Sequence, residues 1–252
     1  YSLSQDQSSG DWIEARKLIS QKLVSGDQFG TALAVKGNLG VVGIGGADYG
    51  LGTVAIYERM GREWTEVTRV FNNSDALSSI TGEEVSCEEG TASEYTCNEV
   101  DMLSFLSVED VGGARGVQLN DVWGWTDPSS NREYALVGRY DGTSFVDVTE
   151  ASNPRYLGNL PMTDGARGNV WRDIKVYRDH AFIVADGSGP HGMQIFDLTK
   201  LREVTGEPQT FEEDAHYRRI ASAHNIVINE ESGFAYVVGV NGGGKPVAAD
   251  FT

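Results

Sequence analysis

Short apolar runs separated by glycine-containing turns recur along most of the chain. Three of them lie at 134–138, 181–185 and 234–239, and each is apolar at consecutive positions. Strands that are buried on both faces lose the polar alternation of a half-exposed sheet. The pattern therefore predicts an all-β protein whose inner strands are sandwiched between neighbouring sheets.

The apolar runs belong to an internal repeat. Strand starts at positions 121, 173 and 225 are spaced 52 residues apart, and tryptophans at 12 and 64 show the same spacing. Each start is followed by a short strand, a turn, a second strand, a glycine-rich turn and a third strand. Units of three or four antiparallel strands that repeat every 40 to 52 residues or so are typical of propeller blades. We expect a β-propeller with about four blade units in this chain.

The repeat sets the expected boundaries within one propeller region over residues 1–252. A long polar insertion, which contains both cysteines, interrupts the register, and the last blade is incomplete. Because four blades are few for a closed propeller, we expect assembly either with other chains or with a missing part of the same chain. The blades are expected at 11–71, 119–161, 170–220 and 223–252, and the insertion at 72–118.

The two cysteines, Cys87 and Cys97, lie in a loop rich in Glu, Ser, Thr and Gly. A lone pair in such a loop is typical of a local disulfide in an oxidising compartment. A metal site is less favoured, because neither CxxC spacing nor a nearby histidine accompanies the cysteines. Asn72 begins a glycosylation sequon, as in a secreted glycoprotein. No apolar run approaches the roughly 20 residues that span a bilayer. We expect a secreted or cell-surface protein.

The chain is strongly acidic, with 37 acidic and 20 basic residues and a net charge of −17. Such a surface repels phosphate backbones and anionic lipids, which disfavours nucleic-acid partners and electrostatic binding to membrane surfaces. Because no long apolar run is present, we expect no direct membrane insertion either. Two interpretations remain open: the charge keeps the protein soluble, or it attracts cations and basic partners.

Two stretches near the N-terminus, 25–35 (SGDQFGTALAV) and 52–57 (GTVAIY), resemble the FG-GAP repeat of integrin-like propellers. A second series of motifs resembles the LVIVD-repeat propellers of the choice-of-anchor B family, and this resemblance implies a secreted or surface-exposed propeller without implying a reaction. The FG-GAP calcium loop carries alternating aspartates, whereas this chain offers only Asp48 there, so Ca²⁺ is a candidate cofactor with partial support. The LVIVD-like motifs lie at 120–128, 134–138, 145–148, 171–177, 191–198 and 222–226.

Polar residues stand at equivalent positions before three inner strands, and equivalent positions on successive blades lie on one ring. These side chains could therefore converge to hold a cation or bind a polar ligand. Alternatively, they cap turns and lock each blade to its neighbour through bonds to backbone N–H groups. The residue types favour the second interpretation and leave the first open. The ring consists of Asn120, Asp121, Arg172, Asp173, His224 and Asn225.

A metal site would draw its ligands from Asp121, Asp173, His191 and His224. The chain contains no HxH or HExxH pattern, so the signature of a zinc hydrolase is missing. Separate structural histidines are the simpler interpretation of His191 and His224.

No Gly-x-Ser-x-Gly elbow or other nucleophile motif occurs, and the cysteines are better used as a bridge. We therefore expect a non-catalytic binding, adhesion or structural module that contacts an extracellular protein or glycan through loops such as 72–118. The alternative is a metal-dependent hydrolase of the lactonase or esterase type, with Asp121, Asp173, His224 and Asn225 as axial ligands. Fold alone does not separate the two, because propellers host both classes.

Overall fold

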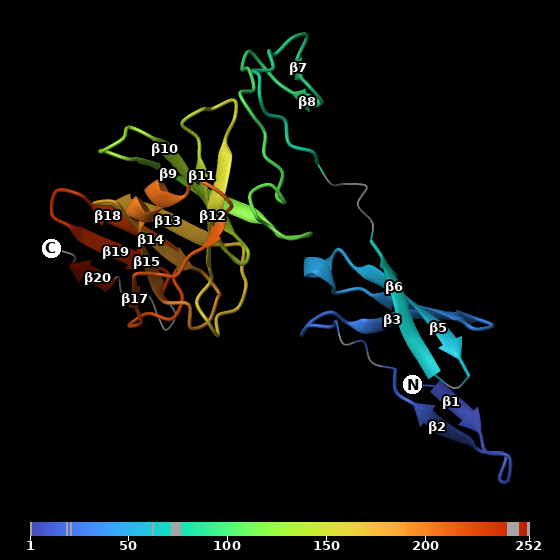
Figure 1. Cartoon of the computed structure of the whole chain (residues 1–252). Helices are drawn as coiled ribbons and strands as arrows, with labels where there is room; N and C mark the ends of the chain where they lie inside the picture. Colours follow the sequence, from blue (N-terminus) through green and yellow to red (C-terminus); the bar gives the residue numbers. More distant parts are fainter. Residues whose placement is uncertain are drawn as a thin grey trace. The chain divides into compact units, whose positions relative to one another are not determined.

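The computed structural model describes residues 2–18, 20, 22–61, 63–71, 77–240 and 247–250. The chain forms two compact units, residues 1–76 and 77–252, where the sequence predicts a single region. Both units consist of mainly antiparallel sheets, and no sheet of the described residues closes on itself (Figure 1). The described helical segments are short 3-10 turns, and none is long and apolar enough to cross a membrane. The predicted all-β class is confirmed.

The first unit contains a two-stranded hairpin and a four-stranded meander. The hairpin pairs β1 with β2, so Trp12 lies outside the sheet that holds Trp64, although the 52-residue spacing aligns them. Trp64 packs against the core of the meander, whereas Trp12 is exposed. The 3-10 turn η1 (Asp48–Gly50) joins β4 to β5. The strands are β1 (Ser2–Gln5), β2 (Trp12–Arg16), β3 (Phe29–Lys36), β4 (Leu39–Ile44), β5 (Thr53–Met60) and β6 (Glu63–Val70).

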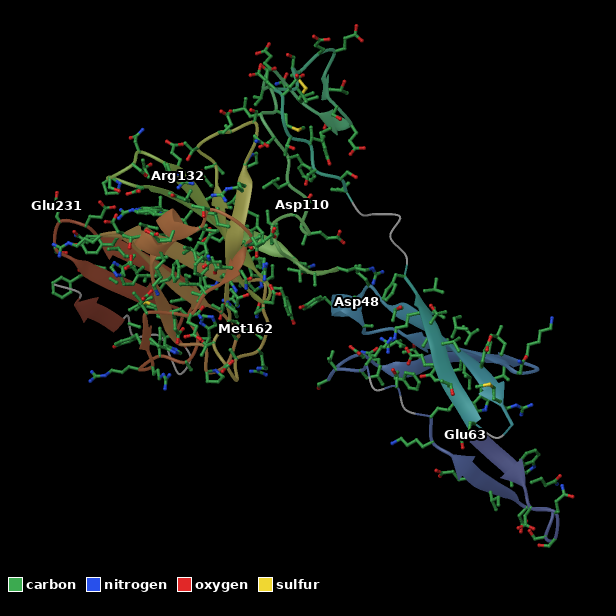
Figure 2. All side chains as sticks on the ribbon, in the orientation of Figure 1. Asp48, Glu63, Asp110, Arg132, Met162 and Glu231 are labelled. Carbon is green, nitrogen blue, oxygen red and sulfur yellow. A yellow bond between two sulfur atoms is a disulfide. The ribbon has the colours of Figure 1, made fainter. Side chains whose placement is uncertain are left out.

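The segment 77–118 begins the second unit, and its outgoing and returning halves run antiparallel. Bridges join Ile80 to Phe105 and Val85 to Met102. At the tip, β7 (Thr91–Ala92) pairs with β8 (Tyr95–Thr96). The predicted disulfide between Cys87 and Cys97 is confirmed, and Figure 2 shows it as a yellow bond. The predicted glycosylation site, Asn72, lies outside the described residues.

The end of this segment covers one face of the next sheet. Val111 packs with Val137 and Val146, and its carbonyl accepts hydrogen bonds from Ser144 Oγ at 2.6 Å and Arg139 Nη1 at 3.3 Å. The insertion is therefore part of the second unit's packing as well as a surface loop.

Three larger sheets follow in the described part of the second unit, each starting as an antiparallel meander (Figure 1). One strand crosses between them, since β16 leaves the second meander and pairs in parallel with β12. The sheets are formed, first, by β9 (Leu119–Thr126), β10 (Glu133–Arg139), β11 (Gly142–Asp147), β12 (Arg155–Pro161) and β16 (Gln209–Thr210); second, by β13 (Arg172–Tyr177), β14 (His180–Ala185), β15 (Met193–Asp197) and β17 (Ala215–Tyr217); and third, by β18 (Asn225–Asn229), β19 (Phe234–Val238) and β20 (Val247–Asp250).

The middle sheet is buried on both faces, as the apolar run at 181–185 predicts. Along β14, Ile183 enters the core shared with the first sheet, while Phe182 and Val184 enter the core shared with the third. The run in β19 behaves differently. Its Val237 is buried, but Tyr236 is 42% exposed, because no further sheet of described residues covers that face.

Candidate functional site

All six residues of the predicted ring line one hollow of about 510 Å³. They come from the starts of β9, β13 and β18, which the 52-residue repeat places at equivalent positions. Trp171 is 59% exposed and completes the lining. We call this space the strand-start hollow. It is lined by Asn120, Asp121, Trp171, Arg172, Asp173, His224 and Asn225.

The carboxylates of this hollow are bound to the backbone of the following sheet. Asp121 Oδ2 accepts the N–H of Ile174 at 2.8 Å, and one repeat later Asp173 Oδ2 accepts the N–H of Ile226 at 2.6 Å. Asn120 adds a bond from its Nδ2 to the carbonyl of Arg172 at 2.8 Å. Contacts of this kind are those expected if the ring residues bind backbone groups and join neighbouring sheets, the second of the two interpretations given above. Ligand binding at the ring stays a prediction.

The residues considered for a metal site are spread over different surroundings. Asp173 Oδ1 lies 2.6 Å from Lys175 Nζ, and His224 Nδ1 lies 3.0 Å from Asp186 Oδ2 on the surface. His191 is fully buried and does not line the strand-start hollow. Among the described residues, no three His, Cys, Asp or Glu side chains are grouped so that they could hold a metal ion.

His191 forms part of a buried polar chain with Arg172. Arg172 Nη1 lies 2.8 Å from His191 Nε2, while His191 Nδ1 lies 3.1 Å from the carbonyl of Gly192. Because a carbonyl only accepts, Nδ1 carries the proton and Nε2 accepts from the guanidinium. Burial, together with the charge of Arg172, lowers the pKa of His191 to about 4. Burial also lowers the pKa of Arg172 to about 10, so at neutral pH the histidine is neutral and the arginine charged.

A second and larger hollow, of about 1050 Å³, lies between the β12 end of the first sheet and the β15–β17 edge of the second. Met162, labelled in Figure 2, is one of its lining residues and lies away from the turns that carry Arg132 and Glu231. We call it the Gln194 hollow. Its lining includes Leu160, Pro161, Met162, Thr163, Asp164, Pro190, Gly192, Gln194, Phe211, Glu212, Glu213, His216, Arg218, Arg219, Ile220, Ala221 and Val240.

Two residues in the wall of the Gln194 hollow carry acceptor atoms that lack a donor. Gln194 is 2% exposed, and its Nε2 donates to the carbonyl of Pro161 at 2.9 Å, which fixes the amide orientation. Its Oε1 has no hydrogen-bond partner among the described residues. The same holds for Glu213 Oε2, whose companion Oε1 lies 2.8 Å from His216 Nδ1. Buried polar atoms in folded proteins are nearly always paired, so two such oxygens in one wall mark a place where donors are missing.

Backbone geometry brings the two hollows into one polar chain. His216 Nε2 donates to the carbonyl of His191 at 2.9 Å, beside Gly192. Gly192 has a φ of 68°, and a Cβ there would lie 2.2 Å from His216 Nε2, so only glycine permits this contact. Hydrogen bonds therefore run from Arg172, at the strand-start hollow, through His191 to His216. At the Gln194 hollow, His216 Nδ1 lies 2.8 Å from Glu213 Oε1 without forming a hydrogen bond.

Neither a family model nor a curated protein matches the sequence. Among solved structures, the chain is similar to one from a structural and mechanistic analysis of two prolyl endopeptidases, with a TM-score of 0.33 and 12% identity. The similarity covers 87% of this chain and 33% of that chain, so this chain spans about a third of the length of that protein. A likeness at this level carries no argument about fold or activity.

The sequence interpretation missed the Gln194 hollow. One signal was present, since Gln194 is a polar residue inside the apolar segment Met193–Asp197. Glu213, which follows another glutamate in a polar segment, is partly buried and contacts His216. Both features depend on the pairing of β15 with β17, which is set by contacts between residues 20 or more positions apart.

The depressed pKa of His191 gives a pH-dependent stability. Its folded-state pKa of about 4 lies below the unfolded value of 6.5, so the unfolded chain binds the proton first as the pH falls. Stability from this group is present above pH 6.5 and is lost as the pH falls towards 4, by about 3 kcal/mol in total. Urea unfolding of the wild type and of His191→Gln at pH 7 and pH 4.5 should show a smaller loss in the variant. Equal losses in the two proteins would contradict this assignment.

Proposed function

We propose that the chain is part of a secreted or cell-surface β-propeller that acts as a non-catalytic binding, adhesion or structural module. Three consecutive, mainly antiparallel sheets support the propeller interpretation, and Asp121 and Asp173 join their starting strands β9, β13 and β18. Apolar cores between successive sheets also fit blades that pack face to face. The disulfide fits an oxidising compartment.

The resemblance to the LVIVD-repeat propellers of the choice-of-anchor B family belongs to the same proposal. The motifs that carry it fall on β9, β10, β11, β13, β15 and the start of β18. The FG-GAP-like stretch falls on β3 and β5 of the first unit. Proteins of both kinds are displayed outside the cell, which supports an extracellular protein or glycan as the partner.

The Gln194 hollow is the proposed binding site, and the unpartnered oxygens of Gln194 and Glu213 are the observation that carries the proposal. Ligand sites are concave, and a few convergent polar groups give them specificity. The strand-start hollow is the weaker candidate, because Asp121 and Asp173 each bind the backbone of the next sheet. The same bonds disfavour the hydrolase alternative, in which these carboxylates would be metal ligands.

A blocking substitution tests the proposal. Ala221 is an exposed residue of the hollow, and in Ala221→Arg a long charged side chain would occupy the space. Ala151→Arg is the matched control, since Ala151 is exposed on a turn of the same unit and does not line the hollow. The purified proteins would be assayed against a panel of extracellular glycans and secreted proteins. We expect saturable binding by the wild type and the control, and loss of binding in Ala221→Arg.

Two results would contradict the proposed function. One is binding that Ala221→Arg leaves unchanged, which would place the site elsewhere. The other is turnover of ester or lactone substrates that disappears in Asp173→Asn, which would support the hydrolase alternative.

A further inference from the structure

We propose that the ligand of the Gln194 hollow is an uncharged saccharide, an inference that rests on the binding function proposed above. The first reason is the balance of charge. The chain carries a net charge of −17, yet the hollow combines three carboxylates with two guanidinium groups, besides His216. A nearly balanced site in a strongly acidic protein favours neither a polycation nor a polyanion. The charged residues of the lining are Asp164, Glu212, Glu213, Arg218 and Arg219.

The second reason is the kind of polar atom that the hollow leaves without a partner. Gln194 Oε1 and Glu213 Oε2 are oxygen acceptors, so the partners that they lack are donors. His216 Nδ1 also makes no hydrogen bond, but it faces Glu213 Oε1 at 2.8 Å. Arg218 and Arg219 are exposed donors, and neither has an ion-pair partner among the described residues. A hydroxyl group both donates and accepts, so a ligand rich in hydroxyl groups can satisfy both kinds of atom at once. The ammonium groups of a cationic ligand could pair only with the acceptor oxygens. The carboxylates of an anionic ligand could pair only with the arginines.

The third reason is the shape and lining of the hollow. At about 1050 Å³ it lies at the upper end of the range of roughly 300–1,000 Å³ for small-molecule sites, which leaves room for more than one sugar unit. Leu160, Phe211 and Ile220 give it an apolar wall. The C–H faces of a sugar ring can pack against such a wall, while the hydroxyl groups at its edge reach the polar atoms.

The inference is tested with neutral and acidic oligosaccharides and with acidic and basic peptides as probes. Binding would be measured by titration calorimetry on the purified chain. Gln194→Met keeps the length of the side chain and removes the acceptor. Glu213→Gln removes the charge of a partly exposed side chain, so this variant is less disturbing to the fold. The control is Glu231→Gln, on the β18–β19 turn. Thermal melting of each variant would show that it is folded.

We expect neutral oligosaccharides to bind, and both hollow variants to weaken binding about tenfold, the effect of losing one good hydrogen bond. Glu231→Gln should bind like the wild type. A different result would be that acidic sugars or one of the peptide classes bind better than neutral oligosaccharides, and that Ala221→Arg abolishes this binding. The inference of an uncharged saccharide would then be wrong, while the proposed site would stand. Binding of every probe that Ala221→Arg does not change would overturn both proposals.

Discussion

Replacing Phe196 with alanine is expected to lower the free energy of unfolding of the second unit by about 3–5 kcal/mol. Phe196 is fully buried and stacks on Phe145, with 4.7 Å between ring centroids and an interplanar angle of 21°. Its edge also meets Phe211 at 5.2 Å. The three rings come from β11, β15 and the segment after β16, so the substitution opens a cavity where the first two sheets meet.

Hydrogen exchange of β14, resolved by peptide mass spectrometry, reports this effect without interference from the first unit. Val227→Ala is the control, because Val227 is 57% exposed, and its effect should stay within about 0.5 kcal/mol. Wild-type protection of β14 in Phe196→Ala would show that this cluster does not hold the sheets together.

The second large effect is expected for Asp173→Ala, at about 2–4 kcal/mol. The substitution leaves the N–H of the fully buried Ile226 without its acceptor at 2.6 Å and removes the carboxylate that pairs with Lys175. Asp173→Asn should cost clearly less, because the amide oxygen can still accept the N–H of Ile226. The measurement is the exchange rate of the β18 amides in the two variants.

This pair of variants also separates locking from ligation. If Asp173 joins the two sheets, hydrogen exchange of the β18 amides should rise strongly in Asp173→Ala and weakly in Asp173→Asn. The metal content of the protein should not change. If instead the wild type carries a stoichiometric ion that both variants lose, Asp173 is a metal ligand and the locking role is secondary.

The sequence predicts most of the strands, because the buried strands appear in it as apolar runs at a regular spacing. The run that became β14 is buried on both faces because a sheet lies on each side of it. The run that forms β19 is similarly apolar, yet one of its faces is exposed. An apolar composition shows that a strand can be buried on both faces. It does not show whether a second sheet is present to cover the outer face.

The six ring residues could be placed together because the repeat makes their positions equivalent. The Gln194 hollow has no such symmetry. It requires β17 to pair with β15, and residues 161–164 to fold beside them, while β16 crosses to β12. These contacts are specific to one unit and leave no repeated signal. Gln194 itself was visible as a polar residue in an apolar strand, but the sequence does not tell that its amide oxygen lacks a donor.

The bonds of Asp121 and Asp173 give the second unit a serial architecture. Each aspartate contacts the strand that begins one repeat later, and each apolar core is shared by two successive sheets. If these sheets are the blades of a repeat array, as proposed above, the stability of the unit is approximately a sum of nearest-neighbour terms. A mutation in one sheet is then expected to lower the stability of the adjacent sheets, and this effect should decrease with distance along the series. The Gln194 hollow lies at the edge of the middle sheet, so we expect mutations in the first and the third sheet to affect it as well.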